Sequence, residues 1–154
     1  MNATDFLREL ADRREITDLI HGYCLHFDNN EPQAVAALFT DDATVDYGPA
    51  TDTIVGSAAI ATTIAVGLER IFAATSHHVS NIQITFDDSD HAQSVSYLYA
   101  WHRYVDGSPD GELWGRYRHR FVRTGAGWRF RELLLEAAGT ADFHRAVMHP
   151  TGRR

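Results

Sequence analysis

The 154-residue chain contains a single cysteine, Cys24, so no disulfide bond can form within it. It has no apolar run near the roughly 20 residues that span a bilayer, and its first residues lack the layout of a signal peptide. Basic residues are outnumbered, 14 against 21 acidic ones, and the formal net charge of −7 argues against a nucleic-acid-binding face. We therefore expect a cytoplasmic protein that binds neither nucleic acid nor membrane.

Length and composition are those of an ordinary globular protein. The chain is 44% hydrophobic and 23% charged, and a chain of this length has room for a real core. It contains no internal repeat, low-complexity segment or interdomain linker. We therefore expect a single domain over residues 1–154, with a core over about residues 10–138 and a tail over residues 139–154.

The N-terminal part has helical periodicity. Apolar residues recur there at the interval of an amphipathic helix, at Ile16, Ile20, Tyr23 and Phe27. Residues 12–15 have the spacing of a capping box, so we expect a helix to begin near Asp12, after a shorter helical segment, and to end near Asp28. An acid is poorly placed beside the negative end of a helix, which favours a special role for Asp28. A solvated acid at a helix end remains the alternative.

Shorter elements follow. Pro32 is expected to begin a short helix, and residues 43–47 alternate as a strand that residues 53–55 can pair with. Ser57 is expected to be the N-cap of a third helix. A further short helix is expected in the tail, over residues 141–148.

After Phe72 the periodicity changes to two. The pattern predicts four long strands separated by turn residues, at about 73–86, 93–105, 112–123 and 128–137. Hairpin connections make the predicted sheet largely antiparallel. Helices followed by a strongly curved sheet indicate an α+β fold in which the sheet wraps around the first helix.

Two predicted strands carry mixed polar and aromatic residues on the face that should point inward. These residues are Leu98, Ala100, His102 and Tyr104 on one strand, and Leu113, Gly115, Tyr117, His119 and Phe121 on the next. Such a mixture suits a ligand pocket better than a dry core. The alternative is a sheet face covered by a partner subunit.

The stretch 75–81 places two histidines next to each other on a predicted strand. Side chains alternate along a strand, so at most one of His77 and His78 faces the interior. An interior histidine needs a hydrogen-bond partner, and histidine is the side chain suited to proton transfer near neutral pH.

Several segments together resemble the SnoaL-like branch of the nuclear transport factor two-like superfamily. The segments are Arg14–Ile20, Tyr23, Phe27-Asp28, Leu38–Ala43, Ser76–Asn81, Gly115–Tyr117 and Gly127–Phe130. The resemblance implies the cystatin-like, cone-shaped α+β barrel of that superfamily, with a mixed, mostly antiparallel sheet around N-terminal helices and a deep cavity. The fold hosts many functions, so it settles none by itself.

Within this branch the chain is similar to the scytalone dehydratase and hexachlorocyclohexane dehydrochlorinase families, which use a His–Asp pair. The resemblance places that pair on His77 and Asp28, with Tyr47 and His102 as further catalytic candidates. It also implies a cavity lined by aromatic substrate-binding residues, here Tyr23, Phe27 and Tyr117. The chain departs from both families at some positions. A second catalytic-site tyrosine of the dehydratase is Phe27 here, and its serine and asparagine fall near Trp114 and Arg116 and are absent. The cavity arginine of the dehydrochlorinase falls near Leu133.

The resemblance implies a cofactor-independent lyase or isomerase, without a metal, that acts on a small apolar or aromatic substrate. His77 would be the general base, and Asp28 would orient it and stabilise its charged form. Tyr47 and His102 would polarise a carbonyl or protonate a leaving oxygen. The branch also implies a homo-oligomer, a dimer or trimer, and Trp114, Arg116, Arg118 and Arg120 share a strand face that need not line the cavity.

Other interpretations remain open. The pair could be structural, and the protein could be a non-catalytic small-molecule-binding member or a small accessory subunit of a ring-hydroxylating dioxygenase. The remaining histidines have no recognised metal-ligand spacing. Contact between Asp28 and His77 inside a cavity would favour the catalytic interpretation.

Overall fold

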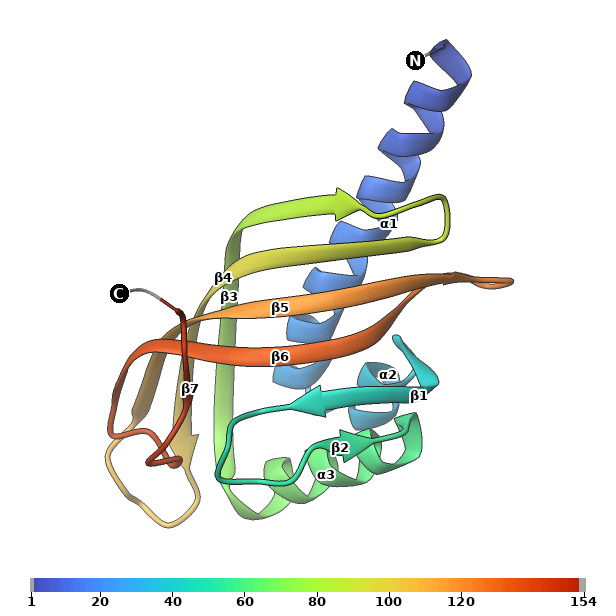
Figure 1. Cartoon of the computed structure of the whole chain (residues 1–154). Helices are drawn as coiled ribbons and strands as arrows, with labels where there is room; N and C mark the ends of the chain where they lie inside the picture. Colours follow the sequence, from blue (N-terminus) through green and yellow to red (C-terminus); the bar gives the residue numbers. More distant parts are fainter. Residues whose placement is uncertain (1, 153–154) are drawn as a thin grey trace.

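A computed structural model describes residues 2–152, with three helices placed against one curved sheet (Figure 1). The helices are α1 (Ala3–Asp28), α2 (Pro32–Ala36) and α3 (Ser57–Arg70). None of the helices in residues 2–152 is long and apolar enough to cross a membrane.

Helix α1 is one continuous element, which corrects the prediction of a capping box at Asp12. The helix begins at Ala3, nine residues before Asp12. Asn2 is its N-cap, and the Asn2 side chain accepts a hydrogen bond of 2.9 Å from the Asp5 N–H. No glycine or proline lies between Ala3 and Asp12 to interrupt a helix. Asp12 is therefore a buried residue in mid-helix, and its carboxylate is free to bind other elements.

Helix α3 corrects a second predicted cap. Gly56, not Ser57, is the N-cap, and no side chain caps this helix end. Gly56 has φ of +95°, in the left-handed region that favours glycine, and its N–H donates to the Ala43 carbonyl over 2.8 Å. Pro32 begins α2, as predicted.

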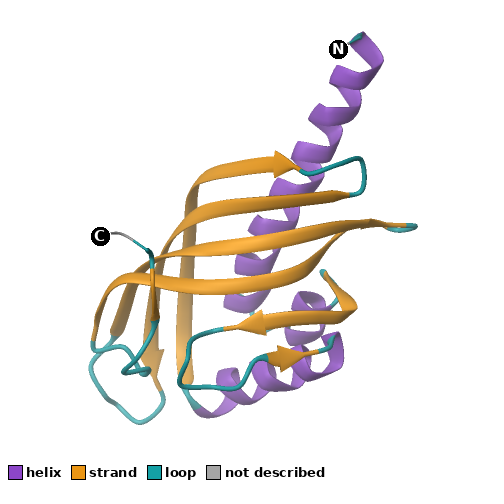
Figure 2. Ribbon diagram, in the orientation of Figure 1, coloured by secondary structure: helices purple, strands orange, loops and turns teal. Residues whose placement is uncertain are grey.

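The seven strands belong to one sheet, coloured orange in Figure 2. They are β1 (Phe39–Asp46), β2 (Ile54–Val55), β3 (Phe72–Phe86), β4 (His91–Tyr104), β5 (Gly111–Thr124), β6 (Gly127–Ala141) and β7 (His149–Pro150). The order is β2-β1-β6-β5-β4-β3, and β7 pairs with β6 beyond the point where β1 leaves it. The four long strands and the return strand at Ile54 are confirmed.

The sheet is mixed and open. β1 and β7 run parallel to β6 and the other pairs are antiparallel. β2 and β3 end the strand order and do not pair with each other, so the sheet curves without closing. The α+β fold class is confirmed. The core lies where α1 and α3 meet the concave face, and its largest fully buried side chains include Trp128, Tyr23, Phe121, Phe130, Ile16 and Ile60.

The C-terminal tail does not form the helix predicted over residues 141–148. The Tyr104 hydroxyl donates to the Asp142 carbonyl over 3.2 Å and accepts from the His144 N–H over 3.0 Å. Asp142 has φ of +46°, which is incompatible with a continuing right-handed helix. The chain turns there and then pairs with β6 as the short parallel strand β7 (Figure 1). No helix forms, because a tyrosine from β4 binds backbone groups that a helix would use.

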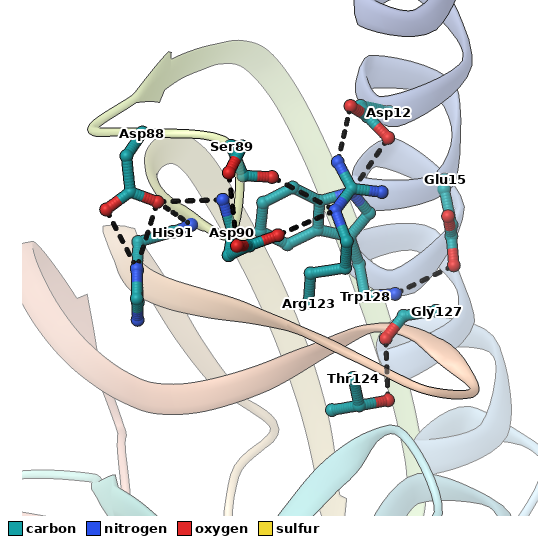
Figure 3. A network of polar contacts seen from close by, with 10 residues as sticks. All are labelled: Asp12, Glu15, Asp88, Ser89, Asp90, His91, Arg123, Thr124, Gly127 and Trp128. Carbon is teal, nitrogen blue, oxygen red and sulfur yellow. Dashed lines mark hydrogen bonds and ion pairs between the residues drawn. The ribbon is translucent and has the colours of Figure 1, made fainter.

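Helix α1 is anchored near its middle to the β5–β6 hairpin (Figure 3). Asp12 accepts hydrogen bonds of 2.6 Å from Arg123 and 3.1 Å from the indole N–H of Trp128. Glu15 accepts a third, of 2.8 Å, from the Trp128 backbone N–H. Burial raises the pKa of Asp12, but the bonds from Arg123 and Trp128 outweigh it and the pKa is lowered. Asp12 is therefore a buried, paired carboxylate.

We expect Asp12→Ala to destabilise the fold. It leaves the buried indole N–H and the Arg123 guanidinium without their acceptor, at about 1–3 kcal/mol, and each kcal/mol lowers the melting temperature by roughly 2–4 °C in a chain of this size. The control is Asp18→Ala on the same helix, which breaks only the exposed pair with Arg14 and should change stability by less than about 1 kcal/mol. Equal melting temperatures for the two variants would contradict the anchoring role of Asp12.

Candidate active site

One carboxylate joins the end of α1 to the first half of β3. Oδ1 of Asp28 accepts hydrogen bonds of 2.6 Å from His77 Nδ1 and 2.8 Å from the Thr75 hydroxyl. Its Oδ2 accepts a third, of 2.8 Å, from the His77 backbone N–H. Thr75 and His77 are two residues apart on a strand and so point to the same side. The predicted contact between Asp28 and His77 is confirmed.

The charge of Asp28 determines which nitrogen of His77 carries the proton. Burial raises the pKa of Asp28, but the bonds from His77 and Thr75 outweigh it and the net effect is a lowered pKa. An ionised carboxylate only accepts hydrogen bonds, so Nδ1 of His77 must be the donor. In the neutral ring the lone pair is then on Nε2, the nitrogen that a general base uses.

The ring of His77 is held by its neighbours as well as by Asp28. Only 5% of its side-chain surface is exposed, against 24% for Asp28. The Phe27 ring lies 4.9 Å from it, centre to centre, and the His102 ring lies 5.5 Å away at 86°. His78 is exposed on the other side of the strand, where its Nε2 lies 2.9 Å from the Ser76 hydroxyl.

His77 lines a cavity of about 50 Å³ together with every other predicted site residue except Asp28. Those residues are Tyr23, Phe27, Tyr47, His102 and Tyr117. Asp28 is not among the residues that line the cavity, so the expectation that both members of the pair line it is wrong for Asp28. Its carboxylate oxygens instead accept three hydrogen bonds from Thr75 and His77 of β3. The volume suits a few water molecules, and a larger ligand has to displace side chains.

Two phenols meet in this cavity. The hydroxyl oxygens of Tyr23, on α1, and Tyr47, just after β1, are 2.6 Å apart. Burial raises the pKa of Tyr47 to about 12 and that of Tyr23 further, so both are neutral at physiological pH. Because one hydroxyl donates to the other, the acceptor of the pair keeps its own proton for another partner.

His102 is neutral in this setting. Burial, with the nearby His77 and His144, lowers the pKa of His102 to about 3. Its Nδ1 has no hydrogen-bond partner within residues 2–152. With so low a pKa the His102 ring is not protonated at neutral pH, so it has no imidazolium proton to give to a leaving group. The predicted role of His102 is therefore reduced to that of a neutral hydrogen-bonding group.

The cavity also contains three consecutive tail residues that the sequence pattern did not indicate, Phe143, His144 and Arg145. Burial and the adjacent Arg145 lower the pKa of His144 to about 4, and neither of its ring nitrogens has a partner in the described part of the chain. The Arg145 guanidinium lies over the Tyr47 ring, 5.2 Å from its centre. The available signal was this run of aromatic and basic residues, which the predicted tail helix obscured.

No group of three or more His, Cys, Asp or Glu side chains in residues 2–152 is arranged to hold a metal ion. The functional groups that line the cavity are one oriented imidazole, three neutral phenols, two neutral histidines and one guanidinium. This set can remove a proton from carbon and hydrogen-bond an oxygen of the same molecule.

Comparisons with known proteins agree with this architecture. A family model described as a SnoaL-like domain matches residues 8–133. A candidate scytalone dehydratase from Novosphingobium aromaticivorans is 35% identical, with a TM-score of 0.88 over 96% of this chain and 97% of that one. A candidate aromatic ring hydroxylase from the same species is 25% identical, with a TM-score of 0.80 over 86% and 93%.

A more distant structure shows the fold alone. The hexachlorocyclohexane dehydrochlorinase of type 3 from Novosphingobium barchaimii is 18% identical, with a TM-score of 0.82 over 94% of this chain and 98% of that one. A search of curated proteins found no significant match.

The buried neutral histidines predict a loss of stability in mild acid. Burial lowers the pKa of His119 from 6.5 to about 3, so the unfolded chain binds a proton there between these values while the folded protein does not. Stability therefore falls as the pH drops below 6.5, by about 2 kcal/mol for such a group at about pH 5. His102 and His144 act in the same direction.

The measurement is the melting temperature at about pH 7.5 and about pH 5. We expect His119→Gln to lose less stability between these pH values than the wild type. His91→Gln, at an exposed histidine, should match the wild type. An equal drop in all three proteins would show that His119 is protonated in the folded state.

Proposed function

The chain belongs to the SnoaL-like family, and on that premise we propose that it is a cofactor-independent lyase or isomerase using His77 and Asp28 as a catalytic dyad. The substrate in this proposal is a small apolar or aromatic molecule with an acidic C–H bond. The observation that carries the proposal is the 2.6 Å hydrogen bond from His77 Nδ1 to Asp28, which leaves Nε2 as the free base of a ring that lines the cavity.

The proposed reaction begins with transfer of a carbon-bound proton to Nε2 of His77. The electrons of the broken C–H bond form a new double bond while a hydroxide or halide leaves the adjacent carbon with its own bonding pair. In an isomerisation the C–H electrons move instead onto a conjugated carbonyl oxygen, and the proton is then returned from His77 to another carbon. Asp28 stabilises the imidazolium that forms. A positioned general base of this kind typically contributes about 10²–10⁴-fold in rate.

Neutral phenols suit the other half of the proposed reaction. The Tyr23–Tyr47 pair has one hydroxyl proton to spare, and a donor aimed at a carbonyl or leaving oxygen stabilises the charge that develops there. His102 would assist as a neutral hydrogen-bonding group, since its pKa is about 3.

Two further functions are supported by particular observations. The likeness to a candidate aromatic ring hydroxylase at 25% identity favours an accessory subunit of a ring-hydroxylating dioxygenase as one alternative. The mostly apolar cavity also suits a non-catalytic binding protein. Neither alternative needs a base whose second nitrogen is held by an ionised carboxylate, which is why we prefer the enzyme.

We expect His77→Ala to lower kcat/KM by about 10²–10⁴-fold while the protein stays folded, because the base is lost. Asp28→Asn should lower activity less, since the base remains without its charge partner. Activity is measured on a panel of small β-hydroxy-carbonyl compounds and halogenated rings, alongside the melting temperature of each variant.

The matched control is His78→Ala, which removes the exposed neighbour on the other side of β3 and should retain full activity. Full activity of His77→Ala on any substrate that the wild type converts would rule out the proposed mechanism. If the pair were structural, each dyad variant would leave a buried polar group without its partner. Both variants would then have a lower melting temperature, because the unpaired group costs about 1–3 kcal/mol of stability.

We also propose a homo-oligomer, a dimer or trimer, assembled through the outer face of β4 and β5. Tyr97 and Trp114 are each 45% exposed there, and the Arg116 guanidinium lies over the Tyr97 ring at 4.8 Å. Exposed aromatic and arginine side chains are typical of protein–protein contacts.

Light scattering at micromolar concentration should therefore give two or three times the monomer mass of 17.3 kDa. Trp114→Glu is expected to give the monomer mass, because it places a charge in the proposed contact. Leu25→Glu, at an exposed apolar position on α1, is the control and should leave the mass unchanged. A monomeric wild type, or a Trp114→Glu variant that still assembles, would contradict this interface.

A further inference from the structure

Arg145 is a partly buried cation without a partner. Its guanidinium lines the cavity of His77, and within residues 2–152 it has neither a carboxylate within 4.0 Å nor a hydrogen-bond acceptor. Its guanidinium lies over the face of the Tyr47 ring, 5.2 Å from the ring centre. By contrast, Arg123 pairs with Asp12 and Arg131 pairs with Asp42.

Burial makes an unpaired guanidinium unfavourable. A charge removed from water has to be paired or hydrogen-bonded to offset its lost hydration, and an aromatic face offsets only part of it. Burial accordingly lowers the pKa of Arg145, although Tyr47 and Tyr23 act against this effect. Something that the bare chain does not supply would complete the site.

The nearby carboxylates are occupied or out of reach. Asp28 binds His77 and Thr75. Asp46 accepts one hydrogen bond from the Gly48 N–H, and its carboxylate lies 3.0 Å from His149 Nε2. Asp52 lines a surface depression that Arg145 also lines, but it is exposed and makes no ion pair with Arg145 within 4.0 Å.

Two neighbouring groups are unsatisfied in the same cavity. Both ring nitrogens of His144 and Nδ1 of His102 are buried without partners in the part of the chain that the structure describes. Three polar side chains that line one apolar cavity, each lacking a partner, indicate a polar ligand group. Because one of the three is a permanent cation, that group should be an anion.

We propose that Arg145 binds a carboxylate of the substrate and so selects, for the reaction proposed above, small aromatic or apolar acids. A guanidinium presents two parallel N–H donors that match the two oxygens of a carboxylate. The formal net charge of −7 repels anions at long range, so recognition of an acid requires such a local cation.

The position of Arg145 also suits selection during binding. Arg145 and Tyr47 line both the cavity of His77 and a surface depression of about 400 Å³ formed with residues 51–63. These two side chains therefore separate the cavity from solvent on this side. A carboxylate that draws the guanidinium away from the Tyr47 ring would open the cavity to the rest of the substrate.

Binding measured by titration calorimetry tests the proposal without depending on turnover. The probes are benzoate, cinnamate and 2-naphthoate, each compared with its neutral primary amide of the same shape. We expect the wild type to prefer the acids by about 10- to 100-fold, the range typical of a hydrogen bond to a charged group. Arg145→Gln should lose this preference, and Arg145→Lys should keep part of it.

The control variant is Arg131→Gln, which removes a surface ion pair with Asp42 and should keep the full preference. His77→Ala should also keep it, so a failed catalytic mechanism and a failed carboxylate site give different results. Wild-type protein with no preference for acid over amide across the three pairs would overturn the proposal. So would an unchanged preference in Arg145→Gln, with its folding checked by circular dichroism.

Discussion

The carboxylate of Asp28 is the group on which the site depends. It lies at the C-terminal end of α1, where the helix dipole disfavours a negative charge, and three hydrogen bonds from β3 offset that effect. The same bonds join helix to strand, fix the orientation of the His77 ring and decide which of its nitrogens is protonated. The hydrogen bonds of Asp28 therefore both support the fold and prepare His77 for proton transfer.

Helix α1 carries a second buried carboxylate whose partners give it a different role. Asp12 pairs with the Arg123 guanidinium and the Trp128 indole, which are donor-only groups that cannot accept a proton at neutral pH, so this contact can only stabilise. Asp28 pairs with histidine, whose second nitrogen remains available for chemistry. The anchor at Asp12 holds the middle of the helix on the β5–β6 hairpin, so that the helix end meets β3 in a fixed position.

Local patterns predicted the parts of the fold that local forces determine. Helical and strand periodicity located α2, α3 and the four long strands, and family resemblance paired Asp28 with His77 before any coordinates. The tail could not be predicted in this way, because Tyr104 sets its path through bonds to residues 38 and 40 positions later. The cavity roles of His144 and Arg145 depend on that distant contact, and so does the neutrality of His102, which burial causes.

The ionised Asp28 holds His77 with its proton on Nδ1 and a lone pair on Nε2. Nitrogen NMR of the assigned His77 ring in labelled protein can detect this arrangement, observed in the neutral form through couplings to the ring carbon protons. We expect the Nδ1 resonance to be that of a protonated nitrogen and the Nε2 resonance that of an unprotonated one. A proton on Nε2 of the neutral ring would contradict the account, because that nitrogen could not accept a proton from a substrate.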